Sequence, residues 1–345
     1  MKNILVTGAG AVLGQGIIRC LTDVRDQYNI HTADPDYKSS GHWLGQKAHI
    51  VKKADNPEFM DSIEGIIRSE KIDLILIGTD VELPVFSQHK SRLKKKYGII
   101  ILVSDPKVIS IANDKFLTAN FLKNNNFRYP ISFMSSDQQG IIFLKNRGSY
   151  PYIAKPIDGA RSVGLELVQS QDDLDRLSSY DNNLVIQEYI PNIDGEYTSG
   201  CLVFNNKCQA VITLKRDLKD GNTSRAYYDK KYDIYNSFIS EVAEKLGVEG
   251  PCNFQFRIKN GQPVIFEINS RFSGTTPIRN FFGFNEVLAC VEYYLNNLGV
   301  KSINLKPGII MRSWSDIFVD EKQLQKLSAD GSLKSPKSIY HPFRK

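Results

Sequence analysis

A polar stripe repeated at every second residue near positions 252–271 most constrains how this chain can fold. Glu267, Asn269 and Arg271 are spaced i, i+2, i+4, so in a β-strand all three project from one face of the sheet. A sheet face that carries a carboxylate, an amide and a guanidinium is costly to bury without a polar ligand. Carboxylate and amide oxygens suit Mg²⁺, and arginine suits phosphate, so a metal-and-phosphate site is favoured over the solvated face of a hairpin.

The same stretch carries a register constraint. A two-residue turn at Asn260-Gly261 would set Gln255 opposite Phe266, on the face away from Glu267. Because side chains alternate between faces, Gln255 can join Glu267 only if the loop has an odd number of residues or the strands carry a β-bulge. We therefore predict one of these two departures from a plain two-residue hairpin.

Length and composition exclude several classes of protein. At 345 residues, with 41% hydrophobic and 24% charged residues, the chain is typical of a soluble protein of two or three domains. Its net charge of +6 is spread along the sequence, which argues against a nucleic-acid partner. No apolar run is long enough for a membrane span and no signal peptide precedes the first strand, so we expect a cytoplasmic protein. The five cysteines are scattered and lack a CxxC motif, which indicates reduced, buried or half-buried thiols.

The first hundred or so residues alternate between apolar strand patterns and helical patterns. This alternation predicts a doubly wound parallel α/β sheet. Strands are expected at 3–7, 29–33, 48–51, 72–77 and 99–103.

A glycine-rich loop, GAGAVLG at 8–14, follows the first strand, and Asp34 comes about twenty residues later, where a ribose-binding acid belongs in a dinucleotide site. The glycine spacing is one residue off the strict pattern, so a tight strand-to-helix turn explains it equally well. An NAD-dependent sugar-modifying enzyme would also need a Tyr-xxx-Lys pair in this region. The one such spacing, Tyr227 with Lys231, lies too late in the chain, and we regard it as coincidence.

Two lysines lie in settings that favour an anion. Asp114 is placed to cap a helix, and Lys115 in its first turn opposes the helix dipole unless it contacts an anion. Lys155 ends the strand predicted at 151–156, just before a glycine-rich loop of the kind that closes over phosphates. Both lysines are therefore candidates for phosphate contacts.

The region after residue 184 contains two acidic residues at strand ends. Glu188 closes the strand predicted at 184–189, whose backbone edge suits adenine, and Glu196 opens the next strand, where it suits ribose hydroxyls. We expect a polar loop at about 214–229, and a tail with one strand near 308–313 and a poorly patterned end.

The order and spacing of these motifs resemble the ATP-grasp superfamily, and most closely one ATP-grasp unit of the carbamoyl-phosphate synthase large subunit. The motifs are NDK at 113–115, AKP at 154–156 with its GARSVG loop, QEYI with GEYT, and NFQF…FEINSR, in which Ser270 replaces the proline of the synthase pattern. The resemblance implies a doubly wound preATP domain followed by an ATP-grasp fold of two α+β subdomains that sandwich the nucleotide. The implied limits are 1–112 for the preATP domain, 113–300 for the ATP-grasp domain (lid about 120–190, large subdomain about 191–300), and 301–345 for a C-terminal extension.

The resemblance also assigns roles to individual residues. Arg271 and Lys155 would be catalytic, and Arg271 would steady the transferring phosphoryl group; in the synthase the position of Lys155 is usually Arg. ATP would contact Lys115, Lys155, Arg161, Ser162, Val163, Gly164, Glu188, Tyr189, Ile190 and Glu196. Mg²⁺ would be held by Gln255, Glu267 and Asn269. The substrate candidates, which rest on position alone, are Asp80, Arg216, Arg225, Ser273 and Thr275, with Arg279 as a further partner for a carboxylate.

The implied activity is that of an ATP-dependent carboxylate–amine ligase, which forms an amide through an acyl phosphate and releases ADP and phosphate. ATP and Mg²⁺, or Mn²⁺ in its place, would be the cofactors. The partners would be a small carboxylate and an amine, and amino acids, short peptides and sugar acids are all compatible; a homodimer is compatible on family grounds. Alternatives are an acyl or carbamate kinase that stops at the mixed anhydride, or a non-catalytic ATP-binding subunit.

Overall fold

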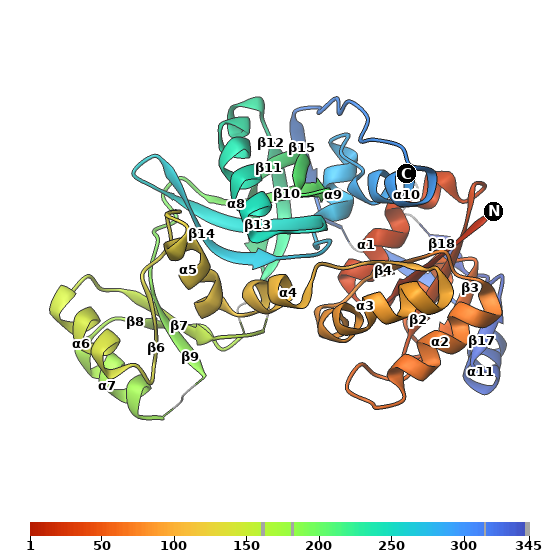
Figure 1. Cartoon of the computed structure of the whole chain (residues 1–345), viewed down its shortest axis with the longest axis horizontal. Helices are drawn as coiled ribbons and strands as arrows, with labels where there is room; N and C mark the ends of the chain where they lie inside the picture. Colours follow the sequence, from red (N-terminus) through yellow and green to blue (C-terminus); the bar gives the residue numbers. More distant parts are fainter. Residues whose placement is uncertain (160–162, 181–182, 314, 342–345) are drawn as a thin grey trace.

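The computed structural model describes residues 1–159, 163–180, 183–313 and 315–341. These residues contain two six-stranded sheets, a four-stranded sheet and a two-stranded sheet (Figure 1). Across the described ranges, no helix combines the length and apolar character that a membrane span requires. The mixed α/β architecture with parallel and antiparallel sheets agrees with the fold class predicted from the sequence.

The N-terminal sheet has the strand order β17-β3-β2-β1-β4-β5, and its first five strands along the chain are parallel, as predicted. Helices α2 and α3 cover one face of this sheet, while α1 packs on the other face together with α10. The strands are β1 (Lys2–Thr7), β2 (Tyr28–Asp34), β3 (Lys47–Ile50), β4 (Leu74–Ile77), β5 (Ile100–Leu102) and β17 (Ser332–Lys334). The helices are α1 (Val12–Cys20), α2 (Phe59–Glu70), α3 (Leu83–Tyr97) and α10 (Glu286–Asn296).

The four-stranded sheet lies in the middle of the chain, and its strands are ordered β6-β9-β7-β8. Its small apolar core includes side chains of α6 and α7. Strand β6 and helix α6 were not expected from the sequence. The elements are β6 (Ser132–Met134), α6 (Gln138–Arg147), β7 (Tyr152–Pro156), β8 (Glu166–Val168), α7 (Gln171–Tyr180) and β9 (Leu184–Glu188).

The second six-stranded sheet is antiparallel and has the order β14-β13-β10-β11-β12-β15. One face packs against α8 and α4, and the other shares a continuous core with α1, α9 and α10, which fixes this sheet against the N-terminal sheet. Its strands are β10 (Glu196–Phe204), β11 (Lys207–Lys219), β12 (Asn222–Tyr228), β13 (Gly250–Lys259), β14 (Gln262–Asn269) and β15 (Gly308–Met311). The helices near it are α4 (Pro106–Asn113), α5 (Lys115–Asn124), α8 (Asn236–Leu246) and α9 (Thr276–Phe281).

The β13–β14 hairpin has the register that the polar stripe requires. Gln255 pairs with Glu267 and Phe256 with Ile265, so a β-bulge places Phe266 as the extra residue and brings Gln255 onto the Glu267 face. The sequence predicted a bulge or a loop with an odd number of residues, and the structure confirms the bulge. The turn itself is a two-residue turn, because Asn260 and Gly261 adopt φ of 52° and 71° between paired Lys259 and Gln262.

Two sequence predictions were wrong. The segment at 214–229 is the β11–β12 hairpin and not a loop; its polar residues belong to strands, and Asp220-Gly221, with φ of 51° and 70°, supplies the tight turn. The tail is also more ordered than predicted, since β16 (Asp316–Phe318), β17, β18 (Ile339–His341) and α11 (Glu321–Asp330) follow β15. Strand β17 returns to pair antiparallel with β3.

Candidate active site

The polar stripe of the β13–β14 hairpin forms a continuous hydrogen-bonded network. Glu267 Oε1 accepts from Gln255 Nε2 at 2.8 Å and from Asn269 Nδ2 at 2.9 Å. The two amide oxygens are taken by guanidinium groups, since Arg216 Nη2 donates to Gln255 Oε1 at 2.5 Å and Arg271 Nη2 donates to Asn269 Oδ1 at 3.0 Å. The alternation read from the sequence therefore produces one face with a central carboxylate between two cations.

The two predicted lysines lie on the same side as this face and line the same cavity as Glu267. Lys155 is buried on β7, and its Nζ donates to Gln187 Oε1 at 2.8 Å. Burial lowers the pKa of Lys155 to about 8, with only partial compensation from the Glu267 carboxylate. Lys115 Nζ donates to the backbone carbonyls of Asp158 and Gly159, and burial lowers its pKa as well. Among the described residues, neither ammonium has a carboxylate hydrogen-bond partner, which leaves both suited to an anion.

Lys115 is positioned by the helix cap that the sequence predicts. The Asp114 carboxylate accepts from the backbone N–H groups of Phe116 and Leu117 at 2.8 and 2.9 Å, which fixes the start of α5. This local structure holds the Lys115 side chain over the loop that begins after β7.

Glu196 is held by two arginines. Arg216 contacts Oε1 at 2.7 Å and Arg257 contacts Oε2 at 2.8 Å, and Glu196 is only 5% exposed. Arg257 follows Gln255 by two positions and shares its face, as strand alternation predicts, but the sequence reasoning assigned it no role in the site. The pairing of β11 with β10 sets Arg216 opposite Glu196, and the prediction of a loop from residue 214 hid this contact because β11 continues to Lys219.

The end of β9, where adenine is expected to bind, lies beside Arg257. Glu188 Oε2 accepts from the Ile131 backbone N–H at 3.2 Å, and its other oxygen pairs with Lys259. The Ile190 carbonyl accepts from Arg257 Nη1 at 2.8 Å, and the Arg257 guanidinium lies 5.6 Å from the centre of the Tyr189 ring. The Glu188 carboxylate thus links the four-stranded sheet to Lys259 of β13. Glu188 and Ile190, at the end of β9, line the narrow cavity.

Two adjoining cavities meet over the polar stripe. The first, about 160 Å³, is lined by Lys155, Glu188, Ile190 and Glu196, and the second, about 640 Å³, extends to the loops of the N-terminal sheet. The residues common to both walls are Lys115, Asp158, Gly159, Arg216, Gly221, Gln255 and Glu267. The structure therefore places Lys115 and Glu267 at the junction between a narrow and a wide compartment, with Lys155 on the wall of the narrow one.

Arg271 joins the stripe to the N-terminal sheet. Its Nε and Nη2 donate to the two carboxylate oxygens of Asp80 at 2.6 and 2.9 Å, a bidentate pair that holds the guanidinium in one orientation. Asp80 follows β4 and lines the wide cavity, as do Ser273 and Thr275, the other predicted substrate residues of this wall.

Arg279 is a structural residue of the same wall. It is 1% exposed, and its guanidinium pairs with Glu286 at 2.6 Å and donates to the hydroxyl oxygens of Ser273 and Thr275 at 3.0 and 2.6 Å. Its donors are fully used inside the protein, so the interpretation of Arg279 as a partner for a substrate carboxylate does not fit its environment. It instead fixes the loop that ends β14.

The remaining predicted residues are distributed as follows. Arg225 is exposed, lies 3.7 Å from Asp217 and lines neither cavity. Val163 is 76% exposed and lines the narrow cavity, next to Gly164 with φ of 73°. Arg161 and Ser162 lie outside the described residues.

Arg312 was missed by the sequence reasoning. It directly follows β15, donates to the Gly274 carbonyl and lines the wide cavity. Burial lowers the pKa of the Arg312 guanidinium, and the nearby positive charge of Arg19 lowers it further. The sequence held no signal for it, because the tail carries no motif and only the pairing of β15 with β12 brings it here.

The glycine loop after β1 is in close contact with Asp34 and with the backbone of Gly41. Both Asp34 oxygens are occupied: Oδ2 accepts from Gly10 N at 2.8 Å, and Oδ1 accepts from Ser39 Oγ at 2.6 Å. A Cβ on Gly41 would lie 1.8 Å from the Ala9 carbonyl oxygen, so that backbone packs directly on the loop. This arrangement supports the tight-turn interpretation, since both Asp34 oxygens already accept hydrogen bonds from the loop and its neighbour Ser39.

Comparisons with known proteins agree with this geometry. Residues 112–275 match the family described as ATP-grasp domain. A carbamoyl phosphate synthase large chain from Thermoplasma acidophilum is 24% identical over 309 residues, covering 81% of this chain and 29% of that protein. One from Clostridium botulinum is 24% identical over 310 residues, covering 81% and 28%. The chain thus spans about three tenths of the length of these curated relatives.

Solved structures show the fold. An N5-carboxyaminoimidazole synthetase from Staphylococcus aureus, complexed with ADP, superposes with a TM-score of 0.72 at 17% identity and covers 95% of this chain and 86% of that one. A biotin carboxylase from Campylobacter jejuni gives a TM-score of 0.70 at 15% identity, covering 89% and 74%. Residues 112–275 therefore match the ATP-grasp domain family, and the chain resembles the ATP-grasp superfamily in both sequence and fold.

Proposed function

We propose that this chain is an ATP-dependent carboxylate–amine ligase that forms an amide through an acyl phosphate. The observation that carries the proposal is the narrow cavity and its junction with the wide one, where Lys115 and Lys155 line the same wall as Glu267. Two ammonium groups with no carboxylate hydrogen-bond partner among the described residues, together with a carboxylate and two amides, match the charge of a polyphosphate and its divalent cation. The structural neighbours, a synthetase complexed with ADP and a biotin carboxylase, support the same proposal.

We assign the narrow cavity to the nucleotide. The strand end at Glu188–Ile190 would contact adenine through its backbone, Glu196 would contact ribose, and Lys155 with Lys115 would contact the phosphates. Glu196 is already paired with Arg216 and Arg257, so these arginines would orient its carboxylate while a ribose hydroxyl donates to it. The loop that holds Arg161, Ser162, Val163 and Gly164 would cover the phosphates.

The residues of the stripe fit a hard divalent cation such as Mg²⁺. Glu267 Oε1 accepts hydrogen bonds from the side-chain amides of Gln255 and Asn269. These N–H groups occupy the position beside the carboxylate that a cation would take. With the ion present, Gln255 and Asn269 would turn their amide oxygens toward it, and Glu267 would supply the charge. Mg²⁺ in this position would neutralise charge on the transferring phosphate.

The chemistry proposed for the chain is phosphoryl transfer followed by attack of an amine. A carboxylate is a poor electrophile, so it first takes the γ-phosphoryl group and becomes an acyl phosphate; the amine then displaces phosphate, and the amide forms. Lys155 and Arg271 would stabilise charge on the phosphoryl group during transfer, and Asp80 would hold Arg271 in orientation. Phosphoryl transfer needs position and charge more than a nucleophilic side chain, in keeping with this site.

The wide cavity is assigned to the acid and the amine. Ser273 and Thr275 line it, and Arg216 joins it to the nucleotide compartment. Arg312 adds a cation whose hydrogen bond in the structure is to the Gly274 carbonyl, so it would pair with an anionic group of a substrate. Arg225 lies in β12, so we keep it as a substrate candidate only if the β11–β12 hairpin moves toward the cavity on binding. The proposed domain limits remain 1–112, 113–300 and 301–345.

The ligase assignment is tested by the dependence of ADP release on substrates. Purified protein with Mg-ATP should release ADP only when both an acid and an amine are supplied, in a screen of acid–amine pairs. An acyl kinase would release ADP with the acid alone, and a non-catalytic subunit would bind Mg-ATP without releasing ADP under any pairing. A thermal shift with NAD(P) and none with Mg-ATP would contradict the nucleotide assignment.

A further inference from the structure

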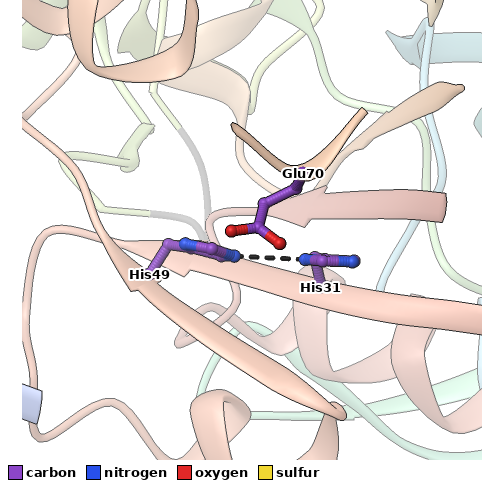
Figure 2. A group of neighbouring side chains, drawn as sticks. All are labelled: His31, His49 and Glu70. Atoms are coloured by element: carbon purple, nitrogen blue, oxygen red, sulfur yellow. Dashed lines mark hydrogen bonds between the residues drawn. The ribbon is translucent and has the colours of Figure 1, made fainter. Parts of the chain in front are cut away.

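Two histidines and a glutamate meet in the N-terminal sheet, apart from both cavities. His31 lies in β2, His49 in β3, and Glu70 is the last residue of α2. His31 Nδ1 and His49 Nε2 are 3.1 Å apart, and one ligand atom from each of the three residues lies within 4.8 Å of the others. Figure 2 shows the Glu70 carboxylate beside the gap between the two imidazole nitrogens.

Strand pairing explains why these side chains converge. His49 pairs with Ala33, and side chains alternate along a strand, so His31 and His49 project from the same face of the sheet. Helix α2 covers this face and ends above the pair. His31 and His49 are 5% and 4% exposed, while the Glu70 side chain is 17% exposed, so the group opens to solvent on the Glu70 side.

The donor set matches a borderline transition-metal ion. Two imidazole nitrogens and one carboxylate oxygen are a known three-ligand set for zinc, with water in the fourth position. Two nitrogens at about 2.0–2.1 Å from a tetrahedral Zn²⁺ lie about 3.3–3.4 Å apart. The observed 3.1 Å separation is therefore within a few tenths of an ångström of the spacing that the ion needs.

We propose that His31, His49 and Glu70 form a binding site for one Zn²⁺-class ion, separate from the ATP site. Each residue would supply one ligand atom, and the ion would replace the hydrogen bond between the imidazoles. Bound there, it would tie β2, β3 and the end of α2 together and stabilise the N-terminal sheet by mass action.

Lys47 is the internal competitor of this site. Its ammonium forms an ion pair with the Glu70 carboxylate, and the Lys47 side chain is 16% exposed. A metal ion would displace the ammonium toward solvent, so the pair weakens metal binding without blocking it. Removal of the Lys47 charge should therefore tighten binding, an effect opposite to that of removing a ligand.

The test uses the full chain, stripped with a chelator and titrated with Co²⁺ as a spectroscopic stand-in for Zn²⁺. We expect one equivalent to produce the visible absorption of a tetrahedral ion and to raise the thermal midpoint. His31→Gln, His49→Gln and Glu70→Gln should each weaken binding by about ten-fold or more. His89→Gln, a histidine of α3 outside the group, is the matched control and should bind as the unchanged protein does. Lys47→Met should bind more tightly.

Three results would overturn the proposal. The first is absence of the tetrahedral absorption at one equivalent. The second is cobalt binding that survives His49→Gln but is lost in Glu267→Gln, because the ion would then lie at the nucleotide site. The third is unchanged or weaker binding in Lys47→Met, a variant that keeps both imidazoles and so remains informative if the histidine variants do not fold.

Discussion

The lowered pKa of Lys155 predicts that nucleotide affinity depends on pH. The ammonium is buried on β7 with one hydrogen bond, to Gln187, and its pKa falls from 10.5 to about 8 because burial removes water from the charge. With this pKa, about nine tenths of the lysine is charged at pH 7 and about one tenth at pH 9. If only the charged form binds the phosphates, the association constant for Mg-ATP should fall about ten-fold across this interval.

The same pKa shift has the opposite effect on the stability of the free protein. The unfolded chain holds the proton of this lysine up to pH 10.5, while the folded chain loses it from about pH 8. Burial of the charge therefore costs about 3 kcal/mol below pH 8, and this cost disappears as the pH rises toward 10.5. Stability attributable to Lys155 thus rises with pH in the window where its phosphate affinity falls.

Calorimetric titration with Mg-ATP at pH 7, 8 and 9 measures the binding effect, and denaturant unfolding over pH 8–10 measures the stability effect. Lys155→Arg keeps a permanent charge and should reduce the pH dependence of affinity to the part that Lys115 contributes, while Lys155→Met should bind weakly at every pH. Lys115 also has a lowered pKa, and it stays in both variants, so it serves as an internal reference. Equal pH dependence in Lys155→Met and in the unchanged protein would refute the reasoning.

Three further substitutions test the account. Glu267→Gln keeps the shape of the stripe but removes its charge, so turnover should fall by about 10²–10³ while the thermal midpoint holds; retained ADP release would contradict the metal assignment. Asp80→Asn weakens the bidentate support of Arg271 and should lower kcat more than it changes the affinity for ATP, measured by steady-state kinetics and calorimetry; unchanged kcat would show that the pair does not orient Arg271. Gly200→Ala would place a Cβ 2.4 Å from Arg279 Cζ, so denaturant unfolding should show a loss of about 1–3 kcal/mol, and a loss near zero would mean that the wall has room to shift.

Local chemistry made much of the fold predictable. The alternation of apolar strand patterns with helical patterns predicted the positions of β1–β5. The capping residue Asp114 predicted the start of α5. The i, i+2, i+4 polar stripe identified the face of β14. The conflict between Gln255 and a two-residue turn predicted either an odd loop or a bulge, and the structure has the bulge. These features depend on side chains close together in sequence, where periodicity and capping rules apply directly.

Other features depend on contacts between distant segments, which periodicity does not encode. Strand β17 pairs with β3 across most of the chain, and Arg312 reaches the wide cavity because β15 pairs with β12. The β11–β12 hairpin was missed because polar side chains occupy both of its faces, although Asp220-Gly221 was an available turn signal. The contacts of Glu196 with Arg216 and Arg257 follow from the pairing of β10 with β11 and with β13, which local periodicity does not encode either.

The central claim is that a substrate carboxylate accepts the γ-phosphoryl group in this site, and isotope transfer tests it most directly. An acid that supports ADP release would be supplied with ¹⁸O in its carboxylate, together with Mg-ATP and the amine. If the acid passes through an acyl phosphate, the released phosphate should carry one ¹⁸O atom from the acid. Unlabelled phosphate, with the amide formed and the second ¹⁸O atom of the acid recovered in water or in another product, would contradict the account.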